Sequence, residues 1–178
     1  AYEWSIGLVG SEMCIRDRDG DGQVTFGYMA FKQKAVKVRE FKIAQKKVLG
    51  GFAGAAADAL TLFEKFEQKL EQYEGDITRA TVELAKDWRM DKMLRHLDAM
   101  LVVMSDKNSF IIAGDGNVIE PDGQVVAIGS GGGFAQAAAL ALISKTKLSA
   151  KQVAFESLKI AADLCIYTNE SISVLEIK

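Results

Sequence analysis

The spacing of apolar residues changes several times along the chain, and each change marks a different predicted element. Short runs with β-branched residues and glycine boundaries predict strands at residues 24–26, 35–39 and 47–52. From Asp58 the apolar spacing becomes three or four, which predicts a helix ending at Gly75 that buries Ala59, Phe63, Phe66, Leu70 and Tyr73. A second predicted helix is capped by Asp76, runs to about Leu94, and buries Ile77, Ala80, Leu84 and Trp88.

The second half of the chain repeats this order of strands followed by helices. Apolar runs predict strands at residues 100–104, 110–113, 118–119 and 124–128. A glycine-rich stretch then leads into an alanine-rich helix at 134–144. Ser149 and Gln152 form a capping box for a last helix through about Leu164, and residues 172–177 alternate as a final strand.

This order of elements can bury every apolar stripe at once if two antiparallel sheets pack face to face between two pairs of helices. The predicted fold class is therefore α+β, a four-layer αββα sandwich. The chain has 178 residues, of which 49% are apolar and 26% charged, with a single proline. These values are typical of one globular domain with a sizeable core.

Charge and cysteine content narrow the classes of function. The net charge of −2 gives no overall footprint for nucleic acid or an anionic membrane. One local basic run is interpreted as the solvated face of a strand: Lys32, Lys34, Lys37, Arg39, Lys42, Lys46 and Lys47. Cys14 and Cys165 are too few for a disulfide framework, and no apolar run approaches the roughly 20 residues that span a bilayer.

Residues 1–18 follow neither a strand nor a helix period. The run LVGSEMCIRDR resembles the translation of a sequencing adapter. We therefore expect residues 1–18 to be an artefactual segment and residues 19–178 to form the domain. A divergent or genuine extension is the alternative.

The stretch from Asp17 to Tyr28 also permits a calcium-site interpretation. Asp17, Asp19 and Asp21 occupy positions one, three and five of an EF-hand loop, and Gly22 takes the sharp turn at position six. Position twelve is Tyr28, so the bidentate glutamate that completes the ligand shell is missing. A calcium-binding module is therefore only an alternative hypothesis.

Several segments resemble, in chain order, the HslV (ClpQ) family of proteasome-like peptidases. They lie between about Gly20 and Thr168 and read GDGQVTFG, KAVKVR, GGFAGAAADALTLFEKFEQKLEQY, ATVELAKDWRMDKMLRHLDAML, AIGSGGGFAQAAALAL and ADLCIYTN. The resemblance implies an N-terminal nucleophile hydrolase, in which a terminal threonine attacks the peptide carbonyl and its own α-amine takes the proton. An α-amine titrates near pH ~8 and needs no histidine. The chain has a single histidine, His96, which excludes a zinc site with two or more histidine ligands.

The resemblance also implies roles for individual residues. Lys37 matches a lysine that lowers the pKa of the nucleophile and its amine, and Asp21 matches the aspartate that keeps this lysine charged. Gly51 matches the glycine whose N–H faces the developing oxyanion. Thr25 matches a backbone position to which substrate adds as a strand. Ser130 matches a serine near the nucleophile's amine, with a simple strand-to-helix turn or an incomplete phosphate-binding loop as alternatives.

A cation site is implied near the end of the last predicted helix. Ala162, Cys165 and Thr168 match a loop whose backbone carbonyls bind a monovalent cation, for which we expect Na⁺. Ala162 stands where the family has glycine. Cys165 itself is expected to be a small buried apolar residue and not a thiolate ligand.

The family's nucleophile is missing from its expected position. Ser5 occupies that register and is followed by Ile6, so a free amine there would require cleavage after Trp4. We expect the chain to keep the family scaffold but to have little or no peptidase activity.

The resemblance extends to assembly and partners. It implies a dodecamer of two stacked six-membered rings, an HslU-type ring ATPase that activates the peptidase, and unfolded polypeptides as substrates. This subunit is expected to bind no nucleotide, nucleic acid or membrane. The expected location is the bacterial cytoplasm or an organelle of bacterial origin. A catalytically inactive ring subunit is the second alternative.

Overall fold

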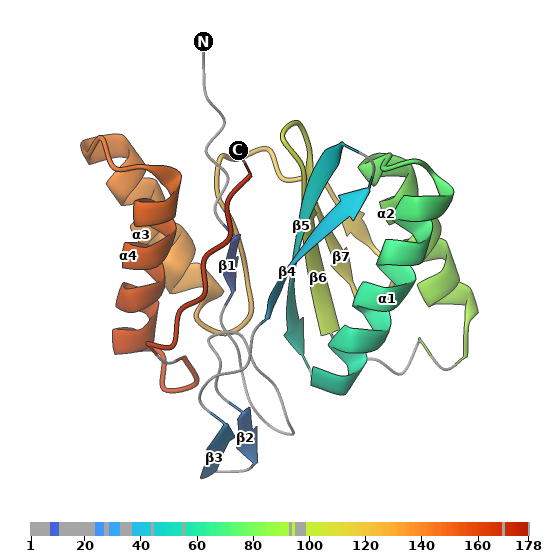
Figure 1. Cartoon of the computed structure of the whole chain (residues 1–178). Helices are drawn as coiled ribbons and strands as arrows, with labels where there is room; N and C mark the ends of the chain where they lie inside the picture. The colour runs from blue at the N-terminus through green and yellow to red at the C-terminus, as the bar shows by residue number, and fades with distance from the viewer. Residues whose placement is uncertain are drawn as a thin grey trace.

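The structure, a computed structural model, describes residues 8–10, 24–26, 29–32, 37–43, 45–54, 56–92, 94, 99–168 and 170–177. Four layers follow one another across the molecule in Figure 1. Helices α1 (Ala56–Gln72) and α2 (Ile77–Met90) cover a five-stranded sheet, and a second strand layer separates that sheet from α3 (Gly132–Lys145) and α4 (Ala150–Leu164). The predicted α+β class and its αββα layering are confirmed.

The five-stranded sheet is antiparallel throughout and follows the order of the chain. Its strands are β4 (Val38–Ile43), β5 (Lys46–Gly54), β6 (Ala99–Met104), β7 (Ser109–Ala113) and β8 (Val118–Ile119). The pair α1 and α2 is inserted between β5 and β6, which are nevertheless neighbours in the sheet. Both helices can therefore fold back over one face of the sheet.

The second strand layer differs from the prediction. Strand β1 (Leu8–Gly10), which sequence analysis did not predict, pairs in parallel with β9 (Val126–Ile128). A three-residue strand is too short to show a period in the sequence. Residues 172–177 form no strand ladder with the described residues. Their apolar side chains nevertheless pack on two sides, with Ile172 and Val174 against α3 and α4, and Leu175 and Ile177 against the five-stranded sheet.

A separate hairpin follows β1. Strand β2 (Val24–Phe26) was predicted, and β3 (Met29–Lys32) pairs with it in antiparallel fashion. The register shifts between Val24 and Thr25, which indicates a bulge or local irregularity.

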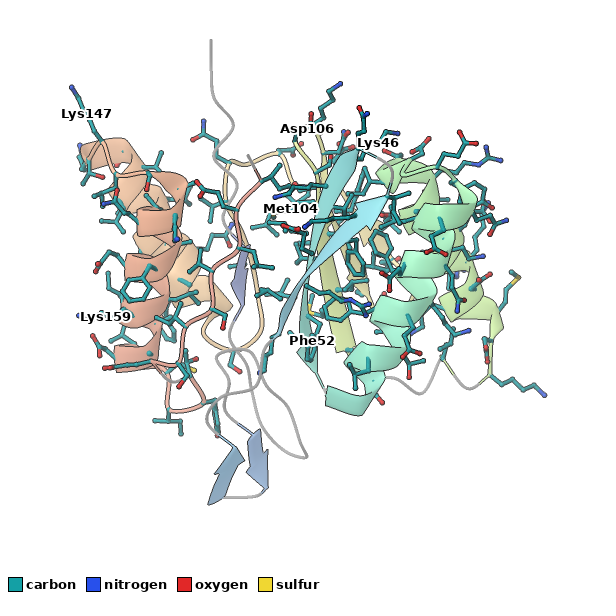
Figure 2. The ribbon with its side chains drawn as sticks, in the orientation of Figure 1. Lys46, Phe52, Met104, Asp106, Lys147 and Lys159 are labelled. Carbon is teal, nitrogen blue, oxygen red and sulfur yellow. The ribbon has the colours of Figure 1, made fainter. Side chains whose placement is uncertain are left out.

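Strand β5 is buried on both faces. Val48 and Phe52 pack among the residues beneath α1 and α2, whereas Leu49 and Ala53 pack toward β9. A strand covered on both sides reads as a continuous apolar run, which explains the sequence VLGGFAG. Figure 2 shows Phe52 near one end of this sheet and Lys46 near the other.

The helix ends agree with the capping rules. The Asp76 carboxylate accepts from the Arg79 N–H over 3.0 Å at the start of α2, as predicted. The helix ends at Met90 and not near Leu94, because Asp91 turns to an extended conformation. The predicted capping box at Ser149 and Gln152 is present. In the described part of the chain, no helix combines the length and apolar character required to cross a membrane.

Candidate active site

Lys37, the residue before β4, and Gly51 of β5 lie at the same end of the five-stranded sheet. Gly51 pairs with Val38, and the Phe52 N–H donates to the Lys37 carbonyl over 3.2 Å. Only 3% of Lys37 is exposed. The interpretation of the basic run as a solvated face is therefore wrong for Lys37, although it holds for Lys42 and Lys46, which are exposed.

Arg39 is a second member of that run with a structural role. Its guanidinium forms an ion pair of 2.6 Å with Glu67 of α1 and lies 5.3 Å from the centre of the Phe41 ring. These contacts connect β4 to α1 two residues from Lys37. No local sequence pattern indicates this connection, because Arg39 and Glu67 are far apart in the chain.

Ser130 lies in the turn between β9 and α3. The preceding Gly129 has φ +88°, a left-handed conformation that favours glycine and lets the chain turn into the helix. The Ser130 hydroxyl is buried, and no described residue serves as its hydrogen-bond partner. Val126 and Ile128 of β9 share a core cluster with Val102, the residue paired with Gly51. The turn therefore belongs to the layer that covers the inner face at Gly51.

The predicted cation loop follows the last turn of α4. Cys165 caps the helix, and its carbonyl accepts from the Thr168 N–H over 2.9 Å, which folds the loop tightly. Cys165 is buried and free, as expected. The Thr168 hydroxyl is buried and has no hydrogen-bond partner among the described residues. This hydroxyl is not one of the predicted ligands, which are backbone carbonyls, so the cation site stays a prediction.

The remaining predicted site residues are Asp21, Ser5 and Thr25. Asp21 and Ser5 lie outside the described residues. Thr25 lies in β2, where its backbone pairs with Ala30. An EF-hand would continue into a helix after Tyr28, but Met29–Lys32 forms strand β3. The calcium-site alternative is therefore not supported by the backbone that follows the loop.

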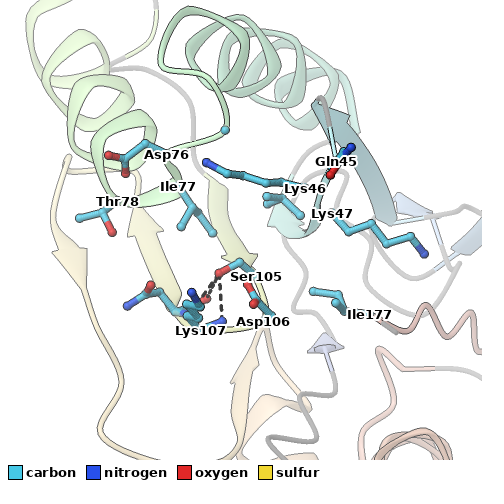
Figure 3. A pocket seen from close by; sticks show the side chains of 13 residues that line it. Gln45, Lys46, Lys47, Asp76, Ile77, Thr78, Ser105, Asp106, Lys107 and Ile177 are labelled. Atoms are coloured by element: carbon cyan, nitrogen blue, oxygen red, sulfur yellow. Dashed lines mark hydrogen bonds between the residues drawn. The ribbon is translucent and has the colours of Figure 1, made fainter.

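A cavity of about 640 Å³ lies at the opposite end of the sheet from Lys37 and Gly51. The turn between β4 and β5, the start of α2 and the turn between β6 and β7 line it (Figure 3). Lys46 reaches across it toward Asp76 and donates to the Glu74 carbonyl over 3.0 Å. Lys47 pairs with Glu40 over 3.1 Å. These two lysines therefore already have structural partners.

Across the residues that the structure covers, no group of three His, Cys, Asp or Glu side chains could hold a metal ion.

Comparison with known proteins assigns the family. The model of the Proteasome family, described as "Proteasome subunit", matches residues 19–177. The chain belongs to the proteasome family. The chain is similar to a solved structure, the crystal structure of eukaryotic HslV from Trypanosoma brucei, with 44% sequence identity and a TM-score of 0.78. The match covers 92% of this chain and 97% of that one.

The proteasome family assignment confirms the resemblance that the sequence segments indicated. It also confirms the N-terminal nucleophile type of fold, because both the sheet order and the flanking helix pairs belong to it. The family assignment implies a threonine-type peptidase by resemblance, and the activity of this chain stays a prediction. The individual roles of Lys37, Asp21, Gly51, Thr25 and Ser130 stay predictions.

Proposed function

We propose that this chain is the peptidase subunit of a two-component ATP-dependent protease of the HslV type. The observation that carries the proposal is the buried Lys37 beside Gly51 at one end of the sheet, in a chain 44% identical to an HslV. A buried lysine is costly unless its charge is used or compensated. Its position next to a glycine amide suits acyl transfer at a peptide carbonyl.

In the proposed mechanism, a terminal hydroxyl attacks the substrate carbonyl and the adjacent α-amine takes its proton. The Lys37 ammonium favours the deprotonated forms of both groups and so lowers their pKa, while Asp21 keeps Lys37 charged. The Gly51 N–H donates to the oxyanion, a contribution typically worth about 10²–10³ in rate. The Ser130 hydroxyl, which has no partner among the described residues, is available to hydrogen-bond the amine.

We assign substrate recognition to the backbone of strand β2. An unfolded polypeptide would add to the β2 backbone at Thr25 as an extra strand. Main-chain hydrogen bonds tolerate many side chains, which suits a protease for unfolded proteins. The proposed Na⁺ would be held by the backbone carbonyls of Ala162, Cys165 and Thr168, and it would stabilise the loop after α4.

The chain as written lacks the nucleophile in this proposal. Ser5 occupies the register of the terminal threonine but follows four residues and has no free α-amine. With four residues before Ser5, the chain is expected to have little or no peptidase activity until it is cut after Trp4. A catalytically inactive ring subunit is the second candidate function. Mixing it with an active relative and measuring ATP-dependent proteolysis separates a regulatory subunit from a disabled peptidase.

Assembly into stacked rings is supported by the outer helix pair. Helix α3 is apolar around its circumference, but only Gly132, Ala135 and Ala139 are buried within the subunit. Large apolar side chains remain exposed on and beside α3 and α4: Phe134, Leu140, Ile143, Leu148, Phe155, Ile160, Leu164 and Ile166. Exposed large apolar side chains gathered on two neighbouring helices are typical of a protein interface. We assign this surface to other copies in a double hexameric ring, and we propose an HslU-type ATPase as activator and a cytoplasmic or organellar location.

The test is hydrolysis of a fluorogenic peptide with a matching ATPase and ATP present. The full chain should show no activity. A version that begins at residue 5 and carries Ser5→Thr should hydrolyse the peptide, and Lys37→Ala should abolish that activity. Lys47→Ala is the control, because this lysine lies in the same sheet but pairs with Glu40. Activity that survives Lys37→Ala, or no activity in an assembled Ser5→Thr version, contradicts the proposal.

A further inference from the structure

Gly50, the residue before the proposed oxyanion donor, packs directly beneath aromatic rings. A Cβ atom added at Gly50 would lie 2.7 Å from Cε2 of Phe41 and 2.9 Å from Cε1 of Phe63. Ordinary contacts between carbon atoms are about 3.5–4.0 Å. Any side chain at Gly50 would therefore force the rings or the strand to move.

The rings themselves are held on several sides. Phe41 meets Phe63 and Phe66 edge to face, with ring centres 5.7 and 5.4 Å apart, and Phe63 meets Phe52 at 5.5 Å. Phe41, Phe63 and Phe66 are at most 3% exposed. Close-packed interiors have little room for such rings to retreat. Part of the displacement would therefore fall on β5.

Displacement at this point acts directly on the candidate site. Gly50 pairs with Arg39, and the next pair along the ladder is Gly51 with Val38. The following residue, Phe52, donates its N–H to the Lys37 carbonyl. Its ring also packs on Phe63. The aromatic rings, the Gly51 amide and the Lys37 backbone are thus connected through three consecutive residues of one strand.

We propose that Gly50 is a positioning residue for the active site: its missing side chain lets Phe41 and Phe63 seat β5 at the depth that brings the Gly51 N–H and Lys37 into register. The catalytic meaning of this register rests on the proposed function. The position of β5 beneath Phe41 and Phe63 does not depend on the proposed function, because it concerns only the packing of the folded chain. With alanine at residue 50, the distance between its Cβ and Phe41 Cε2 must increase by roughly 0.8 Å to reach an ordinary contact.

The test uses Gly50→Ala, the double variant Gly50→Ala with Phe41→Leu, and the control Leu158→Ala. Leucine at residue 41 removes the ring atoms that clash, so the double variant should recover the original register. Leu158 is buried in a different core cluster beside α4, so its truncation destabilises the fold without touching β5. The measurements are crystal structures and hydrogen exchange of the full-length chain, followed at the amides of residues 50–52.

Gly50→Ala should change the separation between Lys37 Nζ and Gly51 N by several tenths of an ångström and increase exchange at the Phe52 amide. The double variant should restore both quantities, and Leu158→Ala should leave both unchanged. Unchanged geometry in Gly50→Ala, or no recovery in the double variant, overturns the proposal. If Leu158→Ala increases hydrogen exchange at the Phe52 amide as much as Gly50→Ala does, the effect is global and the positioning role is likewise refuted.

A kinetic measurement distinguishes this proposal from the proposed function. In the Ser5→Thr version that begins at residue 5, Gly50→Ala should lower kcat about 10–100-fold with KM little changed, because small misplacement of catalytic groups has effects of that size. Phe41→Leu should then recover most of the loss. If that version has no peptidase activity at all, the proposed function fails, while crystal structures and exchange still decide the positioning of Gly51.

Discussion

The Lys69 ammonium of α1 lies 2.8 Å from the Asp87 carboxylate of α2. The Lys69 side chain is only 19% exposed, so it spans the two helices along their contact surface. The hydrogen bond to Asp87 raises the pKa of Lys69 above its ordinary value, against a smaller opposing effect of burial. This pair fixes α1 against α2 on the outer side of the sheet.

Replacing Lys69 by methionine should lower the free energy of unfolding by about 0.5–1 kcal/mol near neutral pH. Because the pKa is raised in the folded state, the stabilisation is complete below the unfolded value of about 10.4 and is lost as pH rises through the folded value. Urea unfolding of both proteins at pH 8 and above pH ~11 checks this. The control Lys86→Met removes a more exposed pair with Glu83 and should have a smaller effect. A difference between wild type and Lys69→Met that does not shrink at high pH contradicts the prediction.

Gly116 and Gly133 should respond in opposite directions to alanine. Gly116 has φ +78°, and an added Cβ would collide with the Arg89 side chain. Gly116→Ala should therefore destabilise the fold by about 1–3 kcal/mol. Gly133 lies in α3, and apart from its chain neighbours and the adjacent backbone of the helix no atom lies within 4 Å of an added Cβ, so Gly133→Ala should stabilise the fold by about 0.5–1 kcal/mol. Thermal unfolding of the two variants measures both signs, and equal shifts would refute the steric argument.

The layers could be predicted from sequence because each buried face of a helix or strand produces a regular spacing of apolar residues. The helix residues Ile77, Ala80, Leu84 and Trp88 are all buried, as their spacing indicates. Lys37 and Gly51 were likewise predicted in consecutive strands, at residues 35–39 and 47–52. Gly51 does lie in β5, whereas Lys37 immediately precedes β4. Local patterns are sufficient for these features because they involve residues close in the chain.

Features that depend on distant residues could not be predicted. The burial of Lys37 is hidden by the alternating lysines around it, which are typical of a solvated strand. The fit of Gly50 beneath Phe63 joins a strand to a helix, and nothing local in the sequence distinguishes that glycine from Gly51. The parallel pairing of β1 with β9 joins opposite parts of the chain, so no hydrophobic period could reveal it.

Ser149 should contribute measurably through its capping box. Its hydroxyl accepts from the Gln152 N–H over 3.3 Å, and the Gln152 side chain accepts from the Ser149 N–H over 2.9 Å. Ser149→Ala should cost about 1 kcal/mol of folding free energy. Ser144→Ala is the matched control, because that hydroxyl only bonds back to the Ala141 carbonyl within its own helix. Chemical denaturation should separate the two, and similar losses would contradict a specific capping role.

Glu40 should titrate below the ordinary range for glutamate. Hydrogen bonds from Lys42 and Lys47, at 2.9 and 3.1 Å, lower the pKa of its carboxyl. The folded state therefore gains from this group above the unfolded pKa and loses that gain as pH falls through the folded value. Lys47→Ala should move the titration of Glu40 upward, as followed by NMR of its carboxyl carbon. Lys107→Ala, on the turn between β6 and β7, should leave it unchanged.

Charge on the α3 and α4 surface should prevent assembly. Leu140 and Phe155 are 47% and 44% exposed within the subunit, and we propose that other copies cover them. Introducing Leu140→Glu with Phe155→Glu would bury two carboxylates without partners, which interfaces tolerate poorly. Sedimentation should then change from a large assembly to species as small as the 19.4 kDa subunit. Met90→Glu, on the exposed end of α2, should leave the assembly intact. Disruption by Met90→Glu alone would assign the interface elsewhere, and a wild-type chain that sediments as a single subunit would contradict the proposed assembly.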